Sequence, residues 1–143
     1  MFTKFLFPRN YGERMFSGVL FLLRVVFGAL LMSHGIAKLA NFEQMAGVFP
    51  DVIGIGSGAS LGLAVFAEVF CAAAFILGLL FRLSTIPLIV TMAVAFIGVH
   101  GGSIAEGELA FAYLMVFLIT YIAGPGRYSL DSLLARYLRC DNK

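Results

Sequence analysis

Four long apolar stretches, separated by short polar segments, run along this chain of 143 residues. A helix needs about 20 mostly apolar residues to cross the roughly 30 Å hydrocarbon core of a bilayer. The stretches therefore predict four spanning helices, at about residues 17–40, 60–81, 84–100 and 107–123. Gly124-Pro125-Gly126 is a strong stop signal after the last of them.

The first stretch could alternatively be the apolar segment of a cleaved signal peptide. It is longer than the usual segment of about 7–15 apolar residues, and it lacks a convincing Ala-x-Ala cleavage site. It also contains Arg24. We therefore expect an uncleaved first span.

The residues after Gly126 are too polar for a fifth span, but their apolar positions recur at helical spacing. These positions are Leu130, Leu133, Leu134, Tyr137 and Leu138. The pattern predicts a short amphipathic helix, either at the membrane surface or packed beneath the bundle. The expected fold class is an all-α integral membrane protein, a four-transmembrane-helix bundle with a C-terminal amphipathic helix. We expect an N-terminal segment at 1–16, a membrane domain at 17–126 and a tail at 127–143.

Composition agrees with this fold class. The chain is 61% hydrophobic and 13% charged, with a mean hydropathy of +0.98, whereas soluble domains carry about 25% charged residues. Membrane lipid is therefore the expected surroundings. A net charge of +2 without a basic cluster argues against nucleic-acid binding. Cys71 lies in an apolar stretch and Cys140 in the polar tail, so no disulfide between them is expected.

Lysine and arginine are confined to alternate connections between the predicted spans. They occur in the N-terminal segment, at Arg82 and in the tail, but not in the connections near residues 41–57 and 101–108. Short cytoplasmic loops carry an excess of these residues. The pattern predicts that both termini are cytoplasmic.

Ionisable side chains lie within or at the rim of the predicted spans. They are Arg24, His34, Lys38, Glu68, His100, Glu108 and Tyr113. The first three share a helical stripe with Gly28 and Gly35. A charge at the bilayer centre costs about 2.5–3.5 kcal/mol on insertion scales and normally faces the bundle interior. All except Arg24 lie toward the outer half, which predicts a polar pocket open to the non-cytoplasmic side.

Most of these residues also have a structural explanation. Lys38 and Arg24 could extend toward the two membrane surfaces, and Arg24 could instead pair with Glu68. The histidines could be hydrogen-bonded core groups, Glu106 and Glu108 solvated loop charges, and the tyrosine an interfacial aromatic. A haem between the histidines is not expected, because His34 and His100 lie at depths that differ by several residues. A metal site is not expected either, because no local ligand spacing such as His-x-x-x-His occurs.

The order of these residues resembles the DoxX family over about residues 22–131. The matching elements are Arg24, His34-Gly35-x-x-Lys38, Glu68, Gly78-Leu79-x-x-Arg82, His100, Glu108-x-x-x-x-Tyr113-Leu114 and Gly124-Pro125-Gly126-Arg127-Tyr128-Ser129-Leu130-Asp131. The resemblance implies a four-helix protein of the bacterial inner membrane. It also implies association with oxidoreductase assemblies that handle thiosulfate, thiols and oxidative stress, one related branch being a subunit of thiosulfate:quinone oxidoreductase.

Together, the pocket and the resemblance favour a subunit of such an assembly that binds a small polar or quinone-like ligand. Glu68 and His34 would handle protons, and Arg24 and Lys38 would supply positive charge. The mouth of the pocket would be lined by His100, Glu108 and Tyr113. A quinone is the candidate cofactor, and a homo-oligomer is a candidate assembly. Two alternatives stay open, namely an oligomeric transporter of a small molecule or protons and a non-catalytic scaffold. Whether the chain itself catalyses a reaction also stays open.

Overall fold

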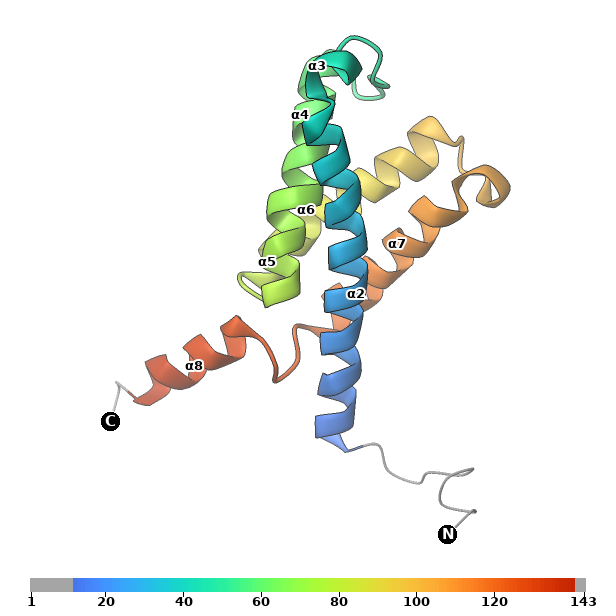
Figure 1. The fold of residues 1–143 in the computed structure, drawn as a ribbon. Coiled ribbons are helices and arrows are strands. Elements are labelled where there is room, and N and C mark those ends of the chain that lie inside the picture. The colour runs from blue at the N-terminus through green and yellow to red at the C-terminus, as the bar shows by residue number, and fades with distance from the viewer. Residues whose placement is uncertain (1–11, 141–143) are drawn as a thin grey trace.

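The computed structural model describes residues 12–140 and the side chains of residues 12–138. This part of the chain is helical, with no strand (Figure 1). Four of its helices are long and apolar enough to cross a membrane: Glu13–Ala40, Ser57–Leu77, Phe81–Val99 and Ile104–Ala123. They confirm the predicted fold class.

The first span is α2 (Glu13–Ala40), which the short helix α3 (Phe42–Met45) follows. The second span consists of α4 (Ser57–Val65), the π-helical segment η1 (Phe66–Cys71) and α5 (Ala72–Leu77). The third consists of α6 (Phe81–Ala93) and a second π-helical segment, η2 (Val94–Val99). The fourth span is α7 (Ile104–Ala123), and the tail contains α8 (Leu130–Cys140).

The connection between the second and third spans lies earlier than the apolar pattern predicts. The second span ends at Leu77, because Gly78 adopts a left-handed conformation with φ 66°. The third begins at Phe81, and the Asp131 carboxylate accepts hydrogen bonds from the Leu80 and Phe81 amides at 2.8 Å each. A distant acid thus caps the start of α6, a contact that hydropathy cannot reveal.

The first two spans lie side by side, and α6 and α7 form a second hairpin that diverges from α2 toward the end where α3 lies (Figure 1). Gly28 of α2 fits against Phe75 and Ile76 of α5, and a Cβ atom there would collide with Ile76. Phe75 is fully buried, with its ring 5.2 Å from that of Phe81 and 5.1 Å from that of Phe117. This aromatic cluster joins the two hairpins.

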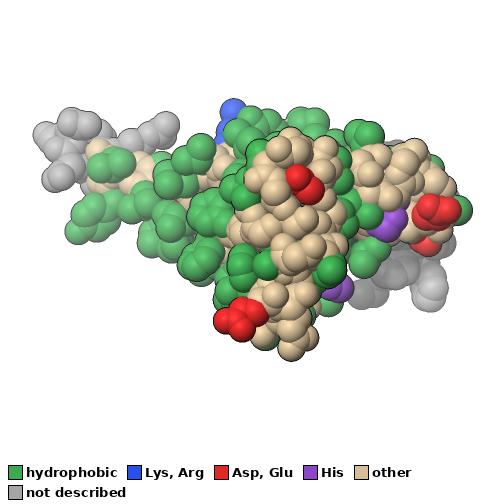
Figure 2. Space-filling model, turned by 90° about the horizontal axis from the view of Figure 1, so that it is seen from above, with side chains coloured by type: hydrophobic (Ala, Val, Ile, Leu, Met, Phe, Trp, Pro, Cys, Tyr) green, Lys and Arg blue, Asp and Glu red, His purple; other side chains and the backbone are tan. Residues whose placement is uncertain are grey.

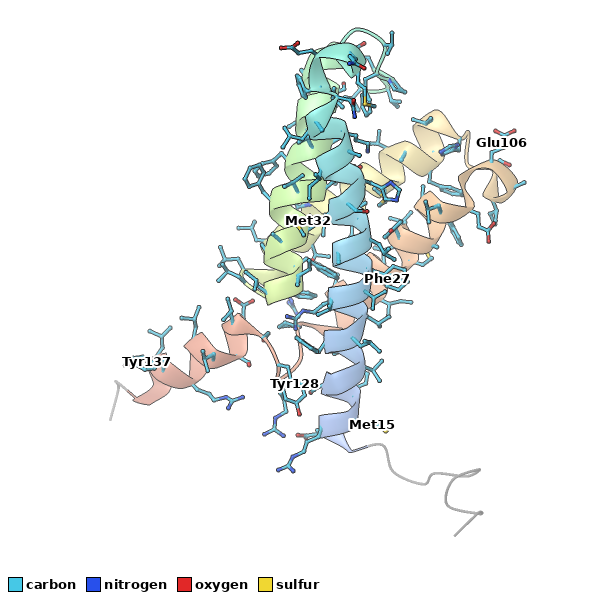
Figure 3. The ribbon with its side chains drawn as sticks, in the orientation of Figure 1. Met15, Phe27, Met32, Glu106, Tyr128 and Tyr137 are labelled. Carbon is cyan, nitrogen blue, oxygen red and sulfur yellow. The ribbon has the colours of Figure 1, made fainter. Side chains whose placement is uncertain are left out.

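Much of the outer surface of the bundle is apolar. Even in the second span, the most enclosed of the four, only 50% of the most apolar 18-residue window is buried. Such a surface is suited to lipid rather than water. Helix α8 extends away from the bundle, and Figure 3 shows Tyr137 on it at a distance from the four spans.

The two ends of the bundle differ in charge. The start of α2, the turn before α6 and helix α8 lie at one end, where the exposed basic residues are Arg14, Arg82, Arg127 and Arg136. The exposed acidic residues of the other end are Glu43, Asp51, Glu106 and Glu108. Figure 2 is the view onto this second end, called the outer end below, and shows acidic and histidine side chains on it.

Candidate functional site

An ion pair links the first two spans in the outer half of the bundle. The Lys38 ammonium donates a hydrogen bond to the Glu68 carboxylate, with 2.5 Å between Nζ and Oε1. The Glu68 side chain is 2% exposed and that of Lys38 is 25% exposed. The lysine therefore compensates a buried negative charge while keeping some contact with the surroundings.

Gly35 brings the two helices close enough for this pair to form. A Cβ atom at Gly35 would lie 2.7 Å from Glu68 Cβ and 2.9 Å from the Glu68 backbone carbon. Lys38 lies three residues further along α2 and hence on the same face. The spacing His-Gly-x-x-Lys thus supplies a close contact and, one turn later, a counter-charge.

The second oxygen of the Glu68 carboxylate has no hydrogen-bond partner among the described residues. Glu68 Oε2 is the one buried side-chain oxygen or nitrogen in that part of the chain without such a partner. Leaving a buried acceptor unsatisfied costs about 1–3 kcal/mol, and more for a charged group. Buried polar groups are normally paired, so this oxygen marks a position where a partner is to be expected.

A cavity of about 140 Å³ lies beside this ion pair. Its polar lining comes from Lys38, Ser60, Glu68 and Thr91. The apolar lining comes from the outer connection at Phe49, Pro50, Val52 and Ile53 and from the second and third spans at Leu63, Ala64, Val90, Val94, Ala95 and Val99. The site is therefore a small apolar chamber with an ion pair in its wall.

The connection between α3 and α4 covers the cavity. Val52 packs onto Gly98 of η2 so closely that a Cβ atom at Gly98 would collide with it. The Lys38 ammonium lies 5.9 Å from the centre of the Phe49 ring, within the range of a cation–π interaction. The cover therefore contacts both the third span and the ion pair.

Asp51 organises this cover. Its carboxylate accepts hydrogen bonds from the Ser60 hydroxyl at 2.8 Å, the Gly56 amide at 2.8 Å and the Ile55 amide at 3.0 Å. These bonds, that of Ser60 foremost, hold the pKa of Asp51 below its ordinary value. The cover is thereby tied to the first turns of α4. The available sequence signal for this role was an aspartate followed by a glycine-rich run.

Both π-helical segments border the cavity. Glu68 lies in η1, while Val94, Ala95 and Val99 lie in η2. A π-helix is wound more widely than an α-helix, with hydrogen bonds between residues five apart. At the end of η2 the His100 amide donates such a hydrogen bond to the Ala95 carbonyl at 3.2 Å. Such segments occur frequently at functional sites. The sequence pattern contains no signal for them.

The other residues predicted for an outer pocket do not line this cavity. His34 is exposed on α2, and Glu108 is exposed near the start of α7. His100 is half-buried and packs against Gly107. A Cβ atom added at Gly107 would lie 2.9 Å from the Cβ atom of His100. Tyr113 is buried between Phe27 and Phe117 in the core. Figure 3 shows Glu106 at the far outer end of α7.

Arg24 binds backbone carbonyls rather than Glu68. Its guanidinium donates to the carbonyls of Phe75 at 3.0 Å and Ile76 at 2.7 Å, at the C-terminal end of α5. It also donates to those of Pro125 at 2.6 Å and Tyr128 at 2.9 Å. A buried cation here satisfies the last carbonyls of a helix and complements its dipole. Arg24 thus connects α2, α5 and the segment after α7.

The closing segment from Gly124 to Asp131 completes this connection. Gly78 lies so near the guanidinium that a Cβ atom would be 2.6 Å from Arg24 Nη2. The Asp131 amide donates to the Gly78 carbonyl at 3.0 Å, while its carboxylate caps α6. The closing segment from Gly124 to Asp131 therefore has a structural role: it connects the helix ends at the end of the bundle opposite the cavity.

Within residues 12–140, no three side chains of histidine, cysteine, aspartate or glutamate come close enough together to hold a metal ion. The unpaired Glu68 Oε2 and the adjacent cavity make the Lys38–Glu68 pair the candidate site of this part of the chain.

Comparison with known proteins places the chain in a family. A model of the DoxX family matches residues 19–101, which include Arg24, Gly35 and both members of the ion pair. An uncharacterized membrane protein of Mycobacterium tuberculosis (strain ATCC 25618 / H37Rv) is 29% identical over 140 residues, covering 80% of each chain. No solved structure matches. Because the family match extends over more than half of a chain with four membrane-spanning helices, this protein belongs to the DoxX family and is a multi-pass membrane protein.

Proposed function

We propose that this DoxX-family protein is the ligand-binding subunit of an oxidoreductase assembly in the bacterial inner membrane. Its cavity would hold the ring of a small quinone-like molecule. The observation that carries this proposal is the buried Glu68 Oε2 in the wall of the cavity, which has no hydrogen-bond partner among the residues that the structure describes. A ligand with a hydrogen-bond donor on its ring, such as the hydroxyl of a quinol, would satisfy this oxygen.

The size of the cavity favours a single ring. An engineered apolar cavity of about 150 Å³ in another protein binds benzene. The cavity beside Glu68 measures about 140 Å³, and Phe49, Leu63 and Val90 contribute apolar walls. A larger fused ring system or a charged metabolite would fit this chamber poorly.

The Lys38–Glu68 ion pair offers hydrogen-bond donors and an acceptor to the polar groups at one edge of that ring. An ammonium group has three donors, so Lys38 can bond a ring oxygen while it holds Glu68. Glu68 Oε2 can accept a hydrogen bond or a proton from a ring hydroxyl. A bound quinone would supply the redox chemistry. The chain's own residues would orient the ring, exclude water and hold a proton at Oε2.

The same proposal places both termini in the cytoplasm and the cavity in the half of the membrane facing away from it. Support comes from the exposed arginines, which gather at the end of the bundle opposite the cavity. His34, His100 and Glu108 lie outside the cavity lining, so the proposal assigns ligand contact to Lys38 and Glu68 alone among the charged side chains.

Anaerobic equilibrium dialysis of the detergent-purified protein against durohydroquinone, a single-ring quinol whose hydroxyl can donate a hydrogen bond to Glu68 Oε2, tests this function. We expect saturable binding that weakens about 10- to 100-fold in Glu68→Gln, the effect of losing one hydrogen bond to a charged group. Ala64→Leu should weaken it similarly by filling the cavity, since Ala64 is a buried lining residue.

Glu108→Gln is the matched control, because Glu108 is exposed and outside the cavity. It should bind like the wild type. Absence of saturable binding, or equal binding by all three variants, would overturn the proposal. Saturable uptake into proteoliposomes that Glu68→Gln abolishes would instead identify a transporter.

A further inference from the structure

A second and larger hollow lies at the opposite end of the bundle from the cavity. It is an open groove of about 710 Å³ between the first half of α2, the end of α5 and helix α8. Phe21 and Val25 of α2 and Leu77 of α5 contribute apolar walls. Tyr128 lies in the groove between α2 and α8, and Figure 3 shows it there. The groove takes no part in the site described above.

Arginines surround the polar side of this groove. Arg127 and Arg136 line it with exposed side chains, and the buried Arg24 lies at its inner end. The Arg24 guanidinium donates hydrogen bonds to four backbone carbonyls and is therefore already occupied. Among the described side chains that line the groove, Arg127 and Arg136 are therefore the two cations available to a ligand.

The acids near these two cations do not neutralise both. Arg127 Nη1 lies 3.7 Å from the carboxylate of Glu13, which is 90% exposed, and surface pairs of this kind are weak. Arg136 forms no ion pair with any described residue. The groove thus combines an apolar wall with an unbalanced positive rim.

Helix α8 places this rim at the level of lipid headgroups. Its leucines and Tyr137 are exposed, and it extends sideways from the end of the bundle where α2 begins (Figure 1). An amphipathic helix with an uncovered apolar face and an arginine on its polar side lies in the plane of the membrane interface. Arg127 and Arg136 would then face phosphate groups, while the walls from α2 and α5 extend into the hydrocarbon.

We infer that the groove is a binding site for an anionic phospholipid. The headgroup phosphate would contact Arg127 and Arg136, and an acyl chain would lie along Phe21, Val25 and Leu77. Basic pockets beside spanning helices recognise anionic lipids in this way, at about 1 kcal/mol for each basic residue near the surface. A zwitterionic lipid brings its own cation to the rim and satisfies the two arginines less well.

Native mass spectrometry of the full chain, extracted from vesicles with equal amounts of phosphatidylglycerol and phosphatidylcholine, tests this inference. The wild type should retain phosphatidylglycerol in preference. Arg127→Gln with Arg136→Gln should reduce that retention about 30-fold, which corresponds to about 2 kcal/mol for two arginines. Both side chains are exposed, so folding should be unaffected.

The control pair Arg14→Gln with Arg82→Gln removes the same charge from the same end of the bundle but leaves the groove intact. It should change retention less than twofold. Equal losses in the two double variants would mean diffuse attraction to a charged membrane and would overturn the inference. So would equal retention of the two lipids by the wild type.

Discussion

Gly35 of the first span lies directly against Glu68 of the second, where a Cβ atom would be only 2.7 Å from Glu68 Cβ. The close approach of these two helices is what allows Lys38 to reach the carboxylate. The ion pair therefore depends on the absence of a side chain at position 35.

Substitution of this glycine should separate the helices. Gly35→Ala is expected to lower the free energy of unfolding by about 1–3 kcal/mol, the usual cost of overpacking. Thermal unfolding in detergent, followed by circular dichroism, measures it. Gly62→Ala is the control, because Gly62 is helical and has no atom within 4 Å of an added Cβ. A stability loss as large in the control would contradict the close-contact explanation.

The ion pair should show strong coupling between its two members. Lys38→Met leaves the Glu68 carboxylate buried without its counter-charge, and breaking a buried pair in this way costs about 3–5 kcal/mol. Since Lys38 is partly exposed, we expect about 2 kcal/mol. Adding Glu68→Gln removes the stranded charge and should recover most of that loss in unfolding experiments. Additive effects of the two substitutions would show that they do not interact.

Replacement of Arg24 should release the closing segment from the bundle. Arg24→Lys keeps the charge but lacks the planar fork of five donors, so it cannot bind all four carbonyls. We expect a loss of at least about 3 kcal/mol, since each hydrogen bond to a charged group contributes about 1.5–3 kcal/mol. Limited proteolysis should cut between Gly124 and Leu130 much faster than in the wild type. Arg14→Lys, an exposed control, should be cut at the wild-type rate.

The cover of the cavity should loosen in acid. The pKa of Asp51 is below its ordinary value of 3.8, so its hydrogen bonds stabilise the folded cover above about pH 4. This contribution is lost as the pH falls through the lowered pKa and the carboxylate becomes protonated. Hydrogen exchange at the Ile55 and Gly56 amides, corrected for intrinsic rates, should speed up over that range. In Asp51→Ala these amides should already exchange rapidly at pH 7, and slow exchange there would contradict the assignment.

The four spans could be predicted from sequence because the bilayer imposes the same requirement on each of them. Only a helix satisfies every backbone donor and acceptor in hydrocarbon, so about 20 apolar residues suffice to identify a span. The order of a few residues, among them Arg24, Glu68 and the closing segment, predicted the DoxX family, and the family match over residues 19–101 confirmed it. The amphipathic pattern of the tail likewise predicted α8, which the structure contains.

The partners of the charged residues could not be predicted in the same way. The positions of Arg24, Lys38 and Glu68 left open which cation would compensate the acid, because a long basic side chain can either extend toward a membrane surface or turn toward a buried acid. Tertiary packing decided it, since Gly35 brings Lys38 to Glu68 while the end of α5 presents its carbonyls to Arg24.

The sequence by itself determined that this is a membrane protein with four helices and charged residues inside them, because hydropathy acts locally along the chain. Only the tertiary structure revealed the candidate site, a cavity at one ion pair that is covered by a connection anchored by Asp51. It also left His34 and Glu108 outside that cavity. The physical reason is that helix rotation, close packing at glycines and π-helical winding depend on contacts between residues far apart in the chain.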